Sequence, residues 1–128
     1  MADLRLKVYG KDLEELFQNA AYGLASILFN DVRKKEKFLR GAGKISVEAL
    51  DQETLLVNFL NEVLTKSIID KKIYPRVKIL RISPRAVEAQ VYGVAVNHCD
   101  EDVKAVSYHN VIIKEGKSGL GTELVLDI

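Results

Sequence analysis

Hydrophobic and polar residues alternate at the start of the chain and then change to a helical period. Residues 4–8 place leucine and valine at every second position, which is the pattern of a half-buried strand, and Gly10 ends it. Asp12 and Glu15 have the spacing of a capping box in front of an apolar run with helical periodicity. This pattern predicts a helix that ends at about Phe29.

The same succession of strand and helix follows in the next part of the chain. Residues 45–49 alternate again, with Ile45 and Val47 on the inward face. Asp51 occupies an N-cap position. The apolar residues behind it recur at helical spacing: Leu55, Leu56, Phe59, Leu60, Val63 and Leu64. A second amphipathic helix is therefore expected.

The C-terminal half has the pattern of about four consecutive strands. The predicted strands and connections, in order, are residues 77–82, the turn Ser83-Pro84, residues 87–93, a polar loop over 97–102, a strand from Lys104 to Lys114, a turn over 116–119 and a strand over 120–127. Strands joined by tight turns pair antiparallel. We therefore expect an α+β fold: a single two-layer domain over residues 1–128, with a mixed or antiparallel sheet and two helices on one face.

The composition supports a single domain and excludes several protein classes. The chain has 128 residues and a net charge of +1, from 19 basic and 18 acidic residues, which excludes a strongly basic nucleic-acid-binding protein. Its single cysteine excludes an internal disulfide framework or a multi-cysteine zinc site. No apolar run approaches the ~20 residues of a membrane span. We expect a cytoplasmic protein without membrane contact.

Two motifs suggest chemistry but lack the context that it needs. Gly116–Ser118 resembles the end of a phosphate-binding loop, but Val111 stands where that loop requires glycine, so a hairpin turn is the better interpretation. His98, Cys99 and His109 do not have the spacing of a zinc site, and no residue that could orient a Cys/His nucleophile is apparent.

The basic stretch from Arg33 to Arg40 has two interpretations. Its lysines and arginines could contact RNA phosphates. Glu36 interrupts the charge, however, and Phe38 is the only aromatic residue in the stretch, which favours a solvated connection between elements.

The predicted topology brings two carboxylates together. Asp3 lies at the beginning of the first strand and Asp127 at the end of the last, so antiparallel pairing of these strands would place them opposite each other, about 5 Å apart. A divalent cation or a lysine would relieve their repulsion. Lys104, which follows the acidic residues 100–102, is expected near the same sheet end. The alternative is that both aspartates are ordinary exposed residues near the chain ends.

Several blocks of the chain resemble the archease family in order and over essentially the whole length. The matching blocks are Ala2-Asp3-Leu4, Tyr9–Glu15, Asn19-Ala20-Ala21, Leu55–Leu64, Asp102–His109 and Leu126-Asp127-Ile128.

The resemblance implies a protein that is not an enzyme by itself. Archeases assist the tRNA-splicing RNA ligase by promoting its guanylation and its multiple turnover. Some members modulate a tRNA cytosine-5 methyltransferase in a chaperone-like way. On this basis we expect an RNA ligase, and in second place a methyltransferase or tRNA itself, as partner, with RNA also contacted through the partner. An enzyme that uses the paired carboxylates for metal-assisted hydrolysis is a third hypothesis, for which no acid/base partner is evident.

The resemblance also implies a site. The family has a metal site, described with calcium, and its ligands correspond to Asp3, Asp127 and the carbonyl of Ile128; magnesium is the alternative ion. The family lysine that is important for ligase activation corresponds to Lys104. Members usually have His-Thr before the Ala-Asp pair, whereas only Met1 precedes Ala2 here. The α-amino group is therefore expected close to the cation site.

Overall fold

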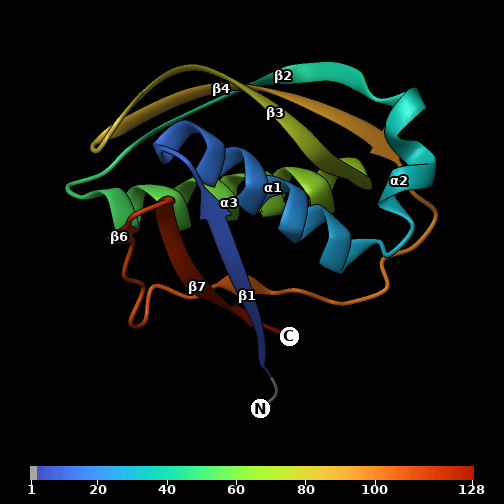
Figure 1. The fold of residues 1–128 in the computed structure, drawn as a ribbon. Helices are drawn as coiled ribbons and strands as arrows, with labels where there is room; N and C mark the ends of the chain where they lie inside the picture. The colour runs from blue at the N-terminus through green and yellow to red at the C-terminus, as the bar shows by residue number, and fades with distance from the viewer. Residues whose placement is uncertain (1–2) are drawn as a thin grey trace.

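A computed structural model describes residues 3–128; the expectation for the α-amino group of Met1 lies outside the described residues. The elements, in chain order, are β1 (Asp3–Gly10), α1 (Leu13–Leu28), α2 (Val32–Lys35), the 3₁₀ turn η1 (Glu36–Phe38), β2 (Arg40–Glu48), α3 (Gln52–Asp70), β3 (Lys72–Ser83), β4 (Ala86–Ala95), β5 (Ala105–Val106), β6 (Lys114–Gly116) and β7 (Gly119–Asp127) (Figure 1). None of these helices is long and apolar enough to cross a membrane.

The strands form two antiparallel sheets. The terminal sheet has the order β1-β7-β5, with β6 also paired to β7, and the middle sheet has the order β2-β4-β3. Figure 1 shows α1 and α3 between the middle sheet and the β1–β7 pair. The α+β class and the antiparallel pairing are confirmed. The arrangement differs from the predicted single sheet, because the helices lie between two sheets and are not confined to one face of one sheet.

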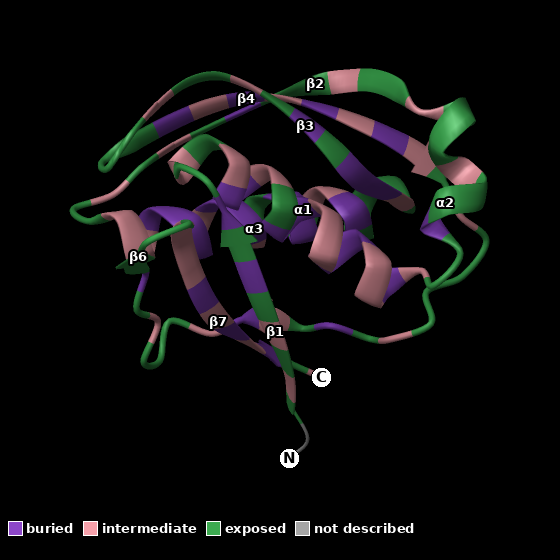
Figure 2. Cartoon of the chain, in the orientation of Figure 1, coloured by how far each residue is buried: buried purple, intermediate pink, exposed green. Residues whose placement is uncertain are grey.

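The wide apolar surface of α3 explains this arrangement. Three consecutive residues of α3, Leu55, Leu56 and Val57, are buried, so apolar side chains point to more than one side of the helix. A helix that is apolar around much of its circumference must be covered on more than one side. Figure 2 shows the buried positions concentrated on both long helices and on the strands that face them. Phe17 of α1 and Phe59 of α3 meet in this core, with ring centroids 5.5 Å apart.

Both long helices begin where the sequence predicts. The Oδ1 atom of Asp12 accepts a hydrogen bond from the backbone N–H of Glu15 at 2.9 Å, and Asp51 accepts one from Thr54 at 2.8 Å. These bonds satisfy N–H groups that have no partner within the helix. The Glu15 carboxylate accepts a further bond from the N–H of Lys11. The predicted caps are therefore confirmed.

The predicted continuous strand from Lys104 to Lys114 is wrong. Only β5 and β6 at its two ends are strands, and Asn110 between them has a left-handed φ of 55°. The side chain of Asn61 on α3 forms hydrogen bonds with both backbone groups of Val106: it accepts from the N–H at 2.8 Å and donates to the carbonyl at 3.0 Å. The backbone groups of β5 that face away from β7 are thus satisfied by a side chain of α3 and not by a further strand.

The basic stretch between α1 and β2 is more ordered than a simple connection. It forms α2 and η1, and most of its charged side chains are exposed. Strand β2 then begins at Arg40, earlier than predicted, with an irregularity in its pairing between Gly41 and Lys44. Gly43 has a φ of 112°, a conformation that glycine adopts readily.

Candidate metal centre

Asp3 and Asp127 lie directly opposite each other in the β1–β7 ladder. The antiparallel register pairs Asp3 with Asp127 at one end and Gly10 with Leu120 at the other. Opposite residues on antiparallel strands point to the same face, with Cβ atoms about 5 Å apart. Both aspartates are exposed, whereas the adjacent Leu126 is fully buried, so the carboxylates lie on the face away from the helices. The register confirms that the first and last strands pair as strand topology predicts, and Figure 1 shows β1 and β7 side by side.

Lys104 lies at the same end of the terminal sheet. It directly precedes β5, which pairs with β7 on the side away from β1. The backbone N–H of Lys104 donates to the carbonyl oxygen of Asp127 at 2.7 Å, and Ala105 stands opposite Asp127 in the register. The side chain of Lys104 is exposed. Two strands and the residue before a third, all remote in sequence, therefore place two carboxylates and one lysine at one end of the terminal sheet.

The donor atoms at this edge suit a hard divalent cation. Calcium and magnesium prefer carboxylate and carbonyl oxygens, which Asp3, Asp127 and the carbonyl of Ile128 can supply. Because both carboxylates are exposed, water can complete the coordination. Within residues 3–128 no group of three or more His, Cys, Asp or Glu side chains is arranged to hold a metal ion. A cation here would therefore have two carboxylates and at most a few carbonyls as protein ligands.

A groove of about 840 Å³ crosses the same outer face of the terminal sheet. Arg5 and Glu123 form an exposed ion pair along it, with Nη1 and Oε1 3.0 Å apart. Tyr9 is 66% exposed and Ile112 is 57% exposed, and both line the groove. Mixed charges beside exposed apolar side chains are typical of surfaces that contact proteins. The groove was not apparent from the sequence, because Tyr9 and Ile112 come together only through the pairing of β1, β6 and β7.

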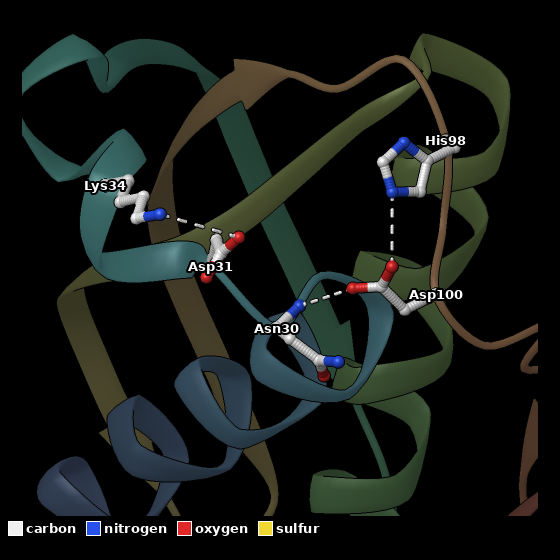
Figure 3. Close-up of polar contacts among 5 residues, drawn as sticks. All are labelled: Asn30, Asp31, Lys34, His98 and Asp100. Atoms are coloured by element: carbon white, nitrogen blue, oxygen red, sulfur yellow. Dashed lines mark hydrogen bonds and ion pairs between the residues drawn. The ribbon is translucent and has the colours of Figure 1, made fainter.

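The weaker motifs have structural roles. Residues 116–119 form the turn between β6 and β7, so the hairpin interpretation is confirmed. The Nε2 atom of His98 lies 3.1 Å from Oδ1 of Asp100, and Oδ2 of Asp100 accepts a hydrogen bond from the backbone N–H of Asn30 at 2.7 Å (Figure 3). Asp100 is therefore engaged at the end of α1. Cys99 is a free, exposed cysteine.

Comparison with known proteins identifies the family. The sequence profile of the Archease protein family matches residues 1–128. The chain belongs to the archease family. The protein archease of Pyrococcus abyssi is 32% identical over 135 aligned residues, which cover 99% of this chain and 93% of that protein. The archease of Pyrococcus furiosus is 33% identical, with the same coverage of 99% and 93%.

Solved archease-like structures share the fold of this chain. The crystal structure of an archease, a possible chaperone, from Thermotoga maritima superposes with a TM-score of 0.70 at 18% identity, covering 99% of this chain and 91% of that one. The solution structure of Methanobacterium thermoautotrophicum protein 1598 superposes with a TM-score of 0.65 at 25% identity, covering 100% and 94%. The fold of this archease-family chain is thus shared with proteins of low sequence identity.

Proposed function

We propose that this archease-family chain is a non-catalytic activator of a tRNA-splicing RNA ligase, promoting ligase guanylation and multiple turnover. In this proposal Asp3, Asp127 and the carbonyl of Ile128 hold a divalent cation, and Lys104 acts on the partner beside it. The observation that carries the proposal is the register that places Asp3 opposite Asp127, with the N–H of Lys104 on the Asp127 carbonyl.

The chemistry of the edge supports a role in assisting another enzyme. A bound cation would supply positive charge that attracts phosphate oxygens, and the exposed Lys104 ammonium adds a second positive group. Both would point outward from a sheet edge, where the phosphates of a partner's active site can reach them. The groove with Tyr9 and Ile112 continues along the same face and offers apolar contact area to that partner.

A multiple-turnover ligation assay tests the proposal. The ligase of the same organism is given excess broken RNA and guanosine triphosphate with a divalent cation, with and without the intact chain. We expect the chain to increase the number of turnovers, and Asp127→Ala to remove this increase because it leaves one carboxylate at the edge. The absence of any stimulation by the intact chain would refute the proposal.

Two further variants separate the cation from the lysine. Lys104→Ala is expected to lose stimulation but to keep cation binding, because its side chain is not a ligand. Asp102→Ala is the matched control: this aspartate is also exposed and precedes Lys104 closely, and no hydrogen bond of its side chain is found among the described residues. Asp102→Ala should stimulate the ligase like the intact chain. If it loses as much stimulation as Asp127→Ala, the effect is not specific to the proposed cation ligand Asp127.

Direct tRNA binding is the second candidate, and the exposed basic segment of α2 and η1 favours it. Arg33, Lys34, Lys37 and Arg40 are exposed, and the Lys37 ammonium lies 5.3 Å from the ring centroid of the exposed Phe38. Basic side chains beside an exposed aromatic ring are typical of contacts to single-stranded RNA. In this form the protein would bind tRNA itself, or present it to a tRNA methyltransferase as a chaperone-like modulator.

Salt dependence distinguishes the two candidates. If the basic segment binds tRNA, the logarithm of the affinity should fall steeply with the logarithm of the salt concentration, and Lys34→Glu with Lys37→Glu should flatten that slope. Glutamate substitution at Lys44, which is exposed on β2, serves as the control. Unchanged ligase stimulation by the Lys34/Lys37 variant would show that the segment is not needed for the first candidate function.

A further inference from the structure

The loop between β4 and β5 is fastened to the end of α1 by a single residue, Asp100. The backbone N–H of Asp100 donates to the carbonyl of Leu28 at 2.8 Å, and its Oδ2 atom accepts from the N–H of Asn30 at 2.7 Å (Figure 3). Leu28 is the last residue of α1, so its carbonyl has no partner within the helix. Asp100 thus contributes both a donor and an acceptor to the chain around this helix end.

The other carboxylate oxygen of Asp100, Oδ1, contacts a residue of the same loop. Oδ1 lies 3.1 Å from Nε2 of His98. The His98 ring packs at an interplanar angle of 55° against the ring of Phe29, the C-cap residue of α1, with ring centroids 5.6 Å apart. Figure 3 shows the carboxylate between His98 and Asn30, with Asp31 and Lys34 forming a separate pair nearby. The Asp100 carboxylate therefore contacts both His98 within this turn and the chain at the end of α1.

An acidic residue is electrostatically unfavourable at this position. The C-terminal end of a helix carries partial negative charge, and the last turn of α1 contains no basic residue that would offset it. The two directed hydrogen-bonding contacts of the Asp100 carboxylate compensate for this repulsion. Favourable capping of the helix therefore does not account for an aspartate here. Its hydrogen-bonding contacts with Asn30 and His98, which hold the loop against the end of α1, do account for it.

The other end of the same loop is fixed at the candidate metal centre. Val103 is buried, and the N–H of Lys104 donates to the carbonyl of Asp127 at 2.7 Å. Only residues 101–103 lie between the two anchors, so the position of the first anchor restricts the path of the chain into the second. We infer that Asp100 is a positioning residue: by fastening the loop to α1 it holds Lys104 in place beside Asp127.

The role of Lys104 in this inference rests on the proposed function. Whether Asp100 holds Lys104 in place can be tested without any partner. Amide hydrogen exchange of the full chain, followed by NMR, reports how often the bond from the Lys104 N–H opens. In Asp100→Ala the Lys104 amide should exchange about tenfold or more faster, while the core amide of Leu124 keeps its protection. Unchanged exchange at Lys104 overturns the inference, and so does an equal acceleration at Leu124, which would indicate global destabilisation.

Two matched variants sharpen this result. Asp100→Asn keeps an acceptor oxygen for the Asn30 N–H but loses the negative charge that faces His98, so its Lys104 exchange should lie between wild type and Asp100→Ala. Asp102→Asn changes an exposed aspartate in the same loop, and its exchange should equal wild type. If Asp102→Asn accelerates exchange as much as Asp100→Ala, the effect is not specific to the contacts of Asp100 and the inference fails.

Ligase stimulation then tests whether Asp100 acts through Lys104. Asp100→Ala should reduce stimulation of the ligase. The double variant Asp100→Ala/Lys104→Ala should stimulate no less than Lys104→Ala alone, because the first change only misplaces the ammonium group that the second change removes. Effects that multiply would show that Asp100 does not act through Lys104. If the wild-type chain does not stimulate the ligase at all, the proposed function fails, and hydrogen exchange still decides whether Asp100 fixes the loop.

Discussion

At the scale of single residues, Gly93 on β4 shows how closely the core is packed. A Cβ atom at this position would lie 2.4 Å from Cε1 of Tyr74 and 2.9 Å from the carbonyl oxygen of Ile73. The Tyr74 ring is 1% exposed and its hydroxyl donates a hydrogen bond to Asp70, so the ring has no space to move aside. The absence of a side chain at Gly93 is therefore a packing requirement.

Gly93→Ala should lower the free energy of unfolding by about 2 kcal/mol, within the range for an overpacked core. Urea denaturation measures this loss. Gly116→Ala is the control, because a Cβ there would have its nearest neighbour, the carbonyl oxygen of Gly119, at 3.9 Å. Its stability should stay within about 0.5 kcal/mol of wild type. Equal losses in the two variants would contradict this account of the core.

Asp70 is expected to link stability to pH. The hydrogen bond from the Tyr74 hydroxyl, followed by the bond from the Lys66 ammonium, lowers the pKa of Asp70 below its ordinary value, while burial and the Asp70 carboxylate raise the pKa of Tyr74. A carboxyl whose pKa is lower in the folded state stabilises the fold above its unfolded-state pKa, and this contribution is lost as the pH falls through the folded-state value. The relevant window therefore lies on the acid side of about pH 4.

Asp70→Asn should accordingly flatten the acid side of the stability profile. Between about pH 5 and about pH 2 the wild type should lose more free energy of unfolding than the variant, because only the wild type must protonate this carboxylate. Denaturant unfolding at a series of pH values gives both curves. Parallel curves over this interval would show that the Asp70–Tyr74 contact does not distinguish the folded from the unfolded state.

At the scale of elements, α3 determines the path of the chain between β5 and β6. Its Asn61 side chain bonds both backbone groups of Val106, and its Glu53 carboxylate accepts from the N–H of Ile113 at 3.0 Å. The hydroxyl of Tyr108 also donates to Asn58 of the same helix. Side chains of α3 thus bond the backbone at Val106 and at Ile113, on either side of the loop, while the N–H of Ser107 still donates to the carbonyl of Val125 on β7.

Asn61→Ala should therefore release the segment locally. We expect a loss of about 1–3 kcal/mol in the free energy of unfolding, since two backbone groups lose their partners, together with faster hydrogen exchange at the Val106 amide. Glu62→Ala changes the neighbouring exposed position of α3 and should leave that amide unaffected. A Val106 amide that exchanges at the wild-type rate in Asn61→Ala would show that the β5–β7 pairing alone holds the segment.

The elements that sequence predicts well are those with strong local signals. The strand around residues 4–8 and the helices behind Asp12 and Asp51 follow from periodicity and capping chemistry, which are local. The position of Asp3 opposite Asp127 was predicted on the condition that the first and last strands pair antiparallel, and the β1–β7 register meets that condition. The interruption after Val106 was not, since it depends on contacts with a helix about 45 residues earlier.

At the scale of the whole molecule, the candidate metal centre depends on the complete fold. Asp3 comes from β1, Asp127 from the end of β7 and Lys104 from the loop before β5, so no isolated segment contains the site. The helices between the two sheets hold these strands together (Figure 1). The division into two sheets and the role of Asp100 could not be read from the sequence, because both arise from packing on α1 and α3. A cation that binds only the folded chain would also stabilise it.

Calorimetric titration of calcium and of magnesium into the wild-type chain and into Asp3→Ala, Asp127→Ala and Asp102→Ala measures directly whether the paired aspartates hold a cation. We expect the wild type to bind at least one of these ions at a single site, Asp3→Ala and Asp127→Ala to lose this binding, and Asp102→Ala to retain it. A wild type that binds neither ion, or an Asp3→Ala variant that binds as tightly as wild type, would contradict the assignment of the cation to the edge formed by Asp3 and Asp127.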